Sequence, residues 1–266
     1  MAYNPHGRSF SGTTANVAVL ALDVGWVPPG AVAVTLDGRP LAGLSRPEGP
    51  DARLWLRREG DSWSAAAKPD PAEKGPHRCG PFKDAFRNRV LFVYGTKGTA
   101  AENAWALAKA RYDAERFWYQ GNASVDVLPD TVFDPSAASD RDRNVILYGH
   151  AESHEDWPAL LGSSPVQVRS GSAKVGDRTA EGDGLSCLFV RPRPGSETAS
   201  VGVVAPTGPA GMRVAATLPY FTSGVAYPDV ILVSTTALSQ GAAGILAAGY
   251  FGNDWGVASG ELAWKP

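Results

Sequence analysis

Apolar and polar positions follow two different patterns along this chain. From residue 16 to about residue 67 the apolar residues come in short alternating segments, separated by turn signals such as Asp37-Gly38 and Gly60-Asp61. Alternation indicates strands buried on one face, and Asp-Gly between two such segments indicates a hairpin. We therefore expect a small antiparallel β layer in this part of the chain.

A proline-rich connector, residues 68–81, follows this layer. It shows neither the alternation of a strand nor the periodicity of a helix. Clusters of proline and glycine interrupt helices and strands, and they are frequent between domains. The sequence therefore predicts two domains. Residues 1–80 hold the β layer and the connector, and residues 81–266 form the larger domain.

Beyond residue 81, apolar runs alternate with segments of helical periodicity, and residues 166–175 read as an inserted hairpin. The expected strands are 90–94, 125–128, 145–148, 188–191, 201–205, 230–233 and 245–248; the expected helices are 100–118, 157–161, 210–218 and 234–239. Strands separated by helices favour a parallel sheet with helices on its faces. We therefore expect an α/β fold with a doubly wound, mainly parallel sheet of the Rossmann or flavodoxin type.

The clearest local signal is the run RVLFVYGTKGTAAENAWALAKARYDAE, residues 89–115. Thr99 followed by Glu102 predicts a capping box at the start of a helix. The loop before this helix offers backbone N–H groups and Lys97, which suit an anion, and Thr96 and Thr99 are candidate ligand contacts. The loop matches no nucleotide-binding motif, and the alternative is an ordinary strand–helix turn.

A second loop, residues 148–156, contains two histidines and three carboxylates. His150, Glu152, His154 and Asp156 are residue types that bind zinc or manganese, and we consider them candidate metal ligands. His150 and His154 would then also be catalytic, by activating water on the metal. The alternative is a polar loop that leads into a helix.

Two more glycine-rich loops follow expected strands. One carries Asn253 as a ligand contact and Asp254 as a base or further metal ligand, and the other carries Thr207 and Arg213 as ligand contacts. Ligands of open α/β sheets bind beyond the carboxyl ends of the strands. Four such loops at one edge would make a pocket there.

The charge and the hydrophobicity of the chain argue against two classes of partner, nucleic acids and membranes. The net charge is −2 with scattered basic residues, which argues against a nucleic-acid partner, and no apolar run reaches the length of a membrane span. The 30 glycines and 21 prolines, with much Ala and Arg, suggest a bacterial gene. The start of the chain has no secretion-signal pattern, so we expect a cytoplasmic protein or an excised piece of an exported one. Cys79 and Cys187 could form one disulfide or remain two thiols.

Four segments of the sequence resemble a known group of proteins. They are GPFKDAFRNRVLFVYGTKGTAAENAWALAKARYDAERFWYQGN, RNVILYG, LFVRPRPGS and YFGNDW. They resemble the C-terminal region of large bacterial secreted hydrolases described as prolyl-oligopeptidase-like or esterase-like. The resemblance implies that a preceding α/β-hydrolase domain carries the serine nucleophile, and this chain has no GxSxG motif of its own. His150 and His154 stand where that family more often has asparagines, which argues against a metal site common to the family.

The expected function is a hydrolase-associated domain that binds a small or anionic ligand at the carboxyl edge of its sheet, with a hydrolase domain as partner. The alternative is a stand-alone, metal-assisted hydrolase of esters or phosphoesters that uses His150, His154 and Asp254. A third interpretation has exposed aromatic residues mediating oligomerisation.

Overall fold

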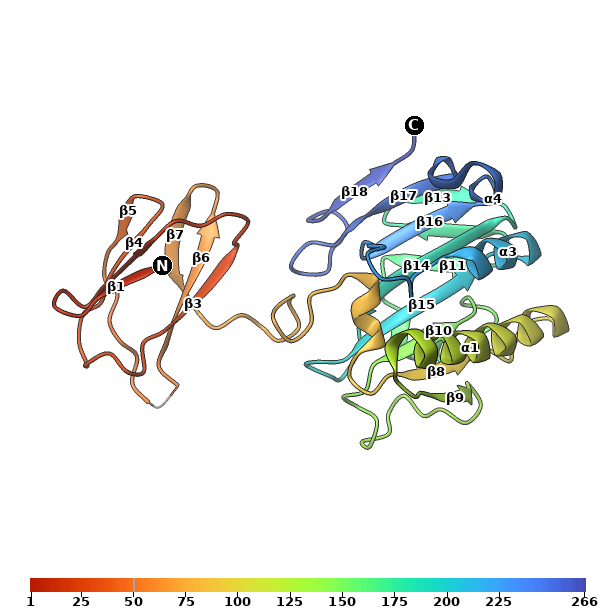
Figure 1. The fold of residues 1–266 in the computed structure, drawn as a ribbon, viewed down its shortest axis with the longest axis horizontal. Helices are drawn as coiled ribbons and strands as arrows, with labels where there is room; N and C mark the ends of the chain where they lie inside the picture. The colour runs from red at the N-terminus through yellow and green to blue at the C-terminus, as the bar shows by residue number, and fades with distance from the viewer. Residues whose placement is uncertain (50) are drawn as a thin grey trace. The chain divides into compact units, whose positions relative to one another are not determined.

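The computed structural model describes residues 1–49 and 51–266. The chain divides into two compact units, Met1–Asp70 and Pro71–Pro266. Figure 1 shows the first unit in red to orange and the second in yellow to blue. Each unit is described by itself.

The first unit consists of two small β-sheets around one core. Its strands are β1 (Ala2–Asn4), β2 (Ser9–Gly12), β3 (Val19–Asp23), β4 (Ala33–Leu36), β5 (Arg39–Leu41), β6 (Arg53–Glu59) and β7 (Ser62–Ala66). One sheet has the order β1-β2-β4-β5 and the other β3-β6-β7. Both contribute buried side chains to one cluster, including Leu36 and Leu56.

The expected single antiparallel layer is therefore corrected to two sheets, one of which contains the parallel pair β2–β4. The expected hairpin is present between β4 and β5. Asp37 and Gly38 have φ angles of 52° and 78° there. These left-handed conformations are the ones that a tight two-residue hairpin turn requires.

The second unit is built on an eight-stranded sheet with the order β18-β17-β16-β14-β15-β10-β8-β9. Its strands are β8 (Leu91–Tyr94), β9 (Asp126–Pro129), β10 (Val145–Tyr148), β14 (Leu185–Pro192), β15 (Ser200–Pro206), β16 (Val230–Ser234), β17 (Ile245–Tyr250) and β18 (Glu261–Trp264). A separate three-stranded sheet consists of β11 (Val166–Arg169), β12 (Ser172–Val175) and β13 (Arg178–Glu181). The helices are η1 (Phe82–Phe86), α1 (Ala100–Gly121), α2 (Trp157–Leu161), α3 (Pro209–Thr217), α4 (Ala237–Gln240) and η2 (Gly241–Gly244).

The prediction of a doubly wound, mainly parallel sheet is wrong. Strands make up 34% of the structure and helices 18%. Within the large sheet, β9, β8, β10 and β15 are parallel, whereas β14, β16, β17 and β18 each pair antiparallel with their neighbours. The fold is therefore β-rich, with a sheet that is half parallel and half antiparallel.

Connection length explains this difference. A crossover between parallel strands needs about a dozen residues or more. Only residues 193–199 separate β14 from β15, and only α4 and η2, with two residues before them, separate β16 from β17. Connections this short join antiparallel strands. The sequence analysis therefore located the apolar strands correctly but predicted the wrong direction for some of them.

Helices α1 and α3 lie across one face of the large sheet (Figure 1). Helix α1 contacts β8, β9 and β10, and α3 contacts β14 and β15. The strands beneath them are continuous apolar runs; all four residues of β10 are buried, as are all seven of β15. One large hydrophobic core therefore joins the strands, α1, α3 and the three-stranded sheet.

The connector after Asp70 belongs to the second unit. Arg78 is buried, and its guanidinium donates to the carbonyls of Ser196 at 3.0 Å and Ala199 at 2.7 Å. Lys74 forms an ion pair with the buried carboxylate of Asp229. These contacts fix the proline-rich segment against the large sheet.

Candidate functional site

The expected capping box at the start of α1 is confirmed. The Glu102 amide donates to the Thr99 hydroxyl at 3.3 Å, and the Thr99 amide donates to Glu102 Oε2 at 2.7 Å. The second carboxylate oxygen, Oε1, lies 3.0 Å from His150 Nε2. One carboxylate thus joins the helix start to the loop after β10.

The glycines of residues 95–99 are needed for close packing. The Lys97 amide donates to the Ser153 carbonyl at 3.0 Å. A Cβ on Gly95 would collide with that same carbonyl oxygen, and one on Gly98 would lie 2.9 Å from the Ser153 Cβ. The loops after β8 and β10 therefore touch, as expected for neighbouring parallel strands, and the glycines permit it.

His150 is held in one tautomer. The Glu152 amide donates to His150 Nδ1 at 3.3 Å, so the ring proton sits on Nε2 and is donated to Glu102. Burial opposes ionisation of Glu102, but hydrogen bonds from His150 and Thr99 lower the pKa of its carboxyl. Both ring nitrogens of His150 therefore serve to fix the loop.

His154 is fixed in the same manner. Its Nδ1 accepts from the Asp156 amide at 3.2 Å, and its Nε2 donates to the Val93 carbonyl at 3.3 Å. Burial lowers the pKa of the imidazole to about 4, although the nearby Asp130 acts in the opposite direction. The ring is therefore neutral around pH 7.

Asp130, which the sequence analysis did not select, connects these loops. Its buried carboxylate accepts the Thr96 amide at 3.1 Å, the Thr96 hydroxyl at 2.5 Å and the Glu155 amide at 2.8 Å. Thr96, an expected ligand contact, thus uses its hydroxyl inside the protein. Lys97 pairs with Glu155 at 3.3 Å, and both side chains are about half exposed.

Asp156 is the unusual carboxyl group at this edge. Its side chain is 7% exposed, and its Oδ2 atom is buried without a hydrogen-bond partner. Burial, with repulsion from Asp130 and Glu155, raises the pKa of this carboxyl to about 7. Asp156 therefore keeps its proton to a higher pH than an exposed aspartate does, beside a neutral histidine.

The four expected metal ligands do not converge. Glu152 accepts from the Ser170 amide at 3.0 Å and lies 3.5 Å from Arg169, while His150 and His154 make the separate contacts given above. Among residues 1–49 and 51–266, no group of three or more His, Cys, Asp or Glu side chains is arranged to hold a metal ion. Zinc or manganese binding remains a prediction that this geometry does not favour.

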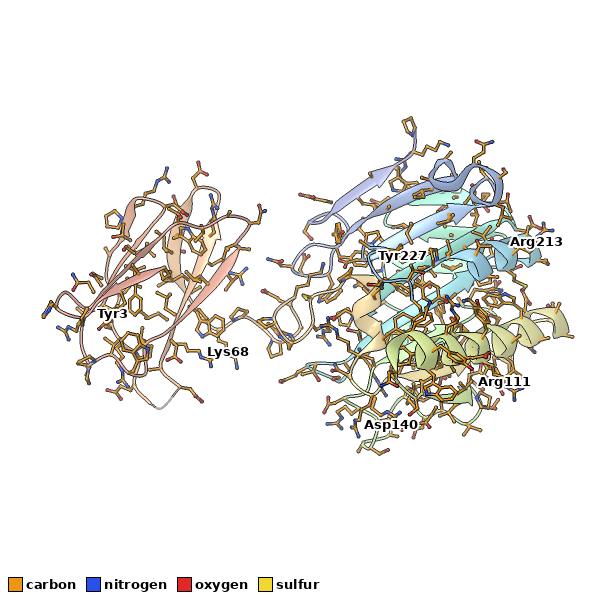
Figure 2. All side chains as sticks on the ribbon, viewed as in Figure 1. Tyr3, Lys68, Arg111, Asp140, Arg213 and Tyr227 are labelled. Carbon is orange, nitrogen blue, oxygen red and sulfur yellow. The ribbon has the colours of Figure 1, made fainter. Side chains whose placement is uncertain are left out.

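The remaining candidates divide between two edges of the sheet. Thr207 is buried and links the end of β15 to the start of β14 by donating to Gly182 O at 2.7 Å and accepting from Leu185 N at 3.1 Å. Arg213 is exposed on α3 (Figure 2). Because β17 runs against the parallel strands, Asn253 and Asp254 lie at the opposite edge.

Asp254 serves its own loop. It accepts from the Gly256 amide at 2.8 Å and from the Ser259 hydroxyl, and these bonds lower the pKa of its carboxyl. The carbonyl of Asn253 accepts from the Lys74 amide at 2.8 Å. Four loops were expected at one edge of the sheet. Only three of them, the loops after β8, β10 and β15, lie there.

A buried polar cluster beneath α1 was missed from the sequence. Lys109 Nζ lies 2.6 Å from Asp113 Oδ1, and the Tyr220 hydroxyl donates to Asp113 Oδ2. The Lys109 ammonium also lies 4.7 Å from the centre of the Tyr220 ring and 5.5 Å from that of Tyr112. The hydroxyl of Tyr148, at the end of β10, is buried without a hydrogen-bond partner and interacts electrostatically with Asp113.

Three residues of this cluster, Lys109, Tyr112 and Asp113, line a cavity of about 120 Å³. Its walls come from α1, from the last residues of α3 and from the chain that follows α3. They are Lys109, Tyr112, Asp113, Arg116, Ala216, Thr217, Leu218, Pro219, Phe221 and Thr222. Burial lowers the pKa of Lys109 and raises that of Asp113. A sequence signal existed: Lys109 and Asp113 share the buried face of α1 with Ala106 and Ala110.

No protein-family model and no curated protein matches this chain. The resemblance to hydrolase C-terminal regions therefore stays a prediction. In the described part of the chain no helix combines the length and apolar character needed to cross a bilayer.

Proposed function

We propose that the second unit is a hydrolase-associated binding module whose ligand is a small oxyanion, held in the cavity beneath α1. The observation that carries this proposal is Lys109. Its side chain is buried and faces the cavity, and among the described residues Asp113 is its one hydrogen-bonding partner. An ammonium has three donors, so two make no hydrogen bond to a described residue, and the ammonium lies beside the Tyr112 and Tyr220 rings.

The charge of the cavity suits an anion. Lys109 and Arg116 contribute two positive charges and Asp113 one negative charge, so the lining carries a net charge of +1. Arg116 is close enough to Lys109 to lower the pKa of its ammonium, after the larger effect of burial. An anion between the two cations would relieve their repulsion.

The volume sets the size of the ligand. Pockets for drug-sized molecules are about 300 Å³ or larger. A cavity of about 120 Å³ suits a carboxylate, phosphate or sulfate group. The ligand is therefore a small oxyanion or the anionic end of a larger molecule.

The carboxyl edge of the sheet is a less suitable place for an anion. Asp130, Glu155 and Asp156 lie together there, and Lys97 is already paired with Glu155. The expected ligand class is thus kept, whereas the position moves from the loops to the cavity. Hydrolase association rests on the sequence resemblance alone.

Catalysis by this chain is not proposed, because both expected catalytic histidines use both ring nitrogens inside the protein. His150 contacts Glu102 and the Glu152 amide, and His154 contacts the Val93 carbonyl and the Asp156 amide. A general base needs a nitrogen within reach of the substrate. Turnover of aryl esters or phosphoesters by the purified protein, lost in His150→Ala, would overturn this conclusion.

Binding is tested by calorimetric titration with sulfate. Lys109→Met and Arg116→Gln should each weaken binding by about tenfold to a hundredfold, since a hydrogen bond to a charged group contributes about 1.5–3 kcal/mol. Arg111→Gln is the matched control, because Arg111 is exposed on the same helix and does not line the cavity (Figure 2). It removes the same charge from α1.

A folding defect in the Lys109 variant would have a specific cause, namely a buried Asp113 without its partner. The double variant Lys109→Met/Asp113→Asn removes both charges and avoids this defect. Sulfate binding that is equal in the wild type, the double variant and Arg116→Gln would refute the proposal, as would an absence of binding to the wild type at every pH tested.

A further inference from the structure

The cavity ligand and Asp113 compete for the same ammonium. Lys109 Nζ lies 2.6 Å from Asp113 Oδ1, and the Asp113 side chain is almost completely buried. An oxyanion that reaches Lys109 therefore approaches a second negative charge at short range. In a poorly solvated site, two like charges at such a distance do not both remain ionised.

We propose that anion capture in this cavity is coupled to the uptake of one proton by Asp113. The inference rests on the proposed function, and it concerns how the same site is regulated. The proton comes from solvent and binds the Asp113 carboxylate, while the oxyanion takes over the Lys109 ammonium. No covalent bond to the ligand forms, and the charge of the protein–anion complex changes by the one added proton.

The surroundings of Asp113 already favour its neutral form. Burial raises the pKa of its carboxyl, and the ion pair with Lys109 together with the Tyr220 hydrogen bond holds that rise in check. When the ligand weakens the contact between Lys109 and Asp113, burial still raises the pKa of the Asp113 carboxyl. Asp113 then binds a proton at a higher pH than in the ligand-free protein.

Among the described residues, several charged or titratable groups lie around Asp113. On α1 these are Lys109, Tyr112 and Arg116; on β10 it is Tyr148; on the chain after α3 they are Tyr220 and, behind it, Tyr227. A protonated Asp113 would lose its ion pair with Lys109 but would still contact the tyrosine hydroxyls. The Tyr148 hydroxyl is buried beside Asp113 and interacts with it electrostatically.

The alternative is that Lys109 and Asp113 remain a fixed ion pair and that the anion binds Arg116 alone. Binding would then be independent of Asp113 and would take up no proton. The two arrangements differ in a measurable number of protons, because a ligand that binds together with one proton loses affinity tenfold for each pH unit above the pKa of the free group.

The experiment is calorimetric titration of the full chain with sulfate, which does not titrate near neutral pH. Titrations run from about pH 6 to about pH 8 in pairs of buffers with different ionisation enthalpies, so that the proton count is measured directly. The wild type should take up a measurable fraction of a proton, at most one, for each sulfate bound. Its affinity should fall as the pH rises, approaching tenfold for each unit.

Two variants identify the group that takes up the proton. Asp113→Asn is nearly isosteric and cannot titrate; it should bind sulfate more tightly at about pH 8 and take up no proton. Tyr220→Phe removes a hydrogen bond that favours the carboxylate, so it should keep the proton uptake but move the loss of affinity to higher pH. Near-ultraviolet circular dichroism checks that each variant is folded.

The outcomes separate this inference from the proposed function. Sulfate binding with a flat pH profile, or proton uptake that persists in Asp113→Asn, would overturn the coupling and leave the binding site intact. Failure of the wild type to bind sulfate at any pH would overturn the binding function itself.

Discussion

Replacing Asp156 by asparagine should reveal a pH dependence of stability that the wild type conceals. Burial raises the pKa of this carboxyl from 3.8 to about 7, so the folded protein holds its proton more tightly than the unfolded chain does. Asp156 therefore favours folding at low pH, and its contribution is lost as the pH rises towards 7. Asparagine cannot titrate and removes that dependence.

His154 has the opposite effect over nearly the same range. Burial lowers the pKa of its imidazole from 6.5 to about 4, so the unfolded chain binds this proton more tightly. The contribution of His154 to stability is present above about pH 6.5 and is lost as the pH falls towards 4. Between these limits the two slopes have opposite sign and nearly cancel in the wild type.

The magnitude follows from the size of the two shifts. One pKa unit corresponds to about 1.4 kcal/mol, and between about pH 4 and pH 6 each group changes the free energy of unfolding by about 2 kcal/mol. The wild type should therefore show little net contribution from the pair. Asp156→Asn should gain about 2 kcal/mol of stability over that range, relative to wild type, as the pH is raised.

The assay is urea denaturation at several pH values, and the quantity compared is the variant-minus-wild-type free energy of unfolding. His154→Gln should give a difference of the opposite sign, falling by about 2 kcal/mol as the pH rises over the same range. Asp177→Asn, in the exposed turn between β12 and β13, controls for the loss of a carboxylate. A difference profile for Asp156→Asn that stays flat from about pH 4 to pH 6 would refute the reasoning.

Three further predictions concern the elements around the site. Thr99→Ala should destabilise the second unit by about 1 kcal/mol and speed hydrogen exchange in the first turn of α1, whereas Thr99→Ser should not; equal behaviour of the two variants would contradict the capping role. Gly211→Ala should cost about 2–3 kcal/mol in urea denaturation, because the added Cβ collides with the Leu185 carbonyl, and an unchanged midpoint would speak against that contact. A thiol reagent should label exposed Cys79 in the folded protein but Cys187 only after unfolding, since burial raises the pKa of the Cys187 thiol; equal labelling rates would count against the buried position.

Local features of the fold could be predicted from the sequence because they depend on neighbouring residues. The capping box of Thr99 and Glu102 begins a helix that starts at Ala100, as expected, and α2 has the expected limits. The hairpin at Asp37-Gly38 was expected for the same reason. Each of these depends on a few adjacent side chains and on backbone conformation.

Strand direction could not be predicted from the same signals. An apolar run that is buried on both faces, such as β14, has the same composition whichever way it runs. The length of the connection at residues 193–199 was the available clue. Contacts between distant residues were equally invisible, and for this reason Asp130 was missed although it binds Thr96 and Glu155.

The candidate site shows the same division. His150 and His154 were selected for their residue type, but the contacts that decide their roles lie 48 and 61 residues away, at Glu102 and Val93. Lys109 and Asp113, four residues apart on α1, were not selected from the sequence. In the structure both side chains are buried, and Tyr220 packs beside them.

The half-parallel, half-antiparallel sheet has a consequence for how the second unit folds. Strands β14 and β15 are joined by residues 193–199 alone, whereas β8 and β10 pair across residues 95–144. Closing the shorter loop loses less chain entropy, so the antiparallel half should form first and act as the template on which β10 and then β8 are added. Pulse-labelled hydrogen exchange should find the amides of β14 and β15 protected before those of β8, and the reverse order would exclude this route.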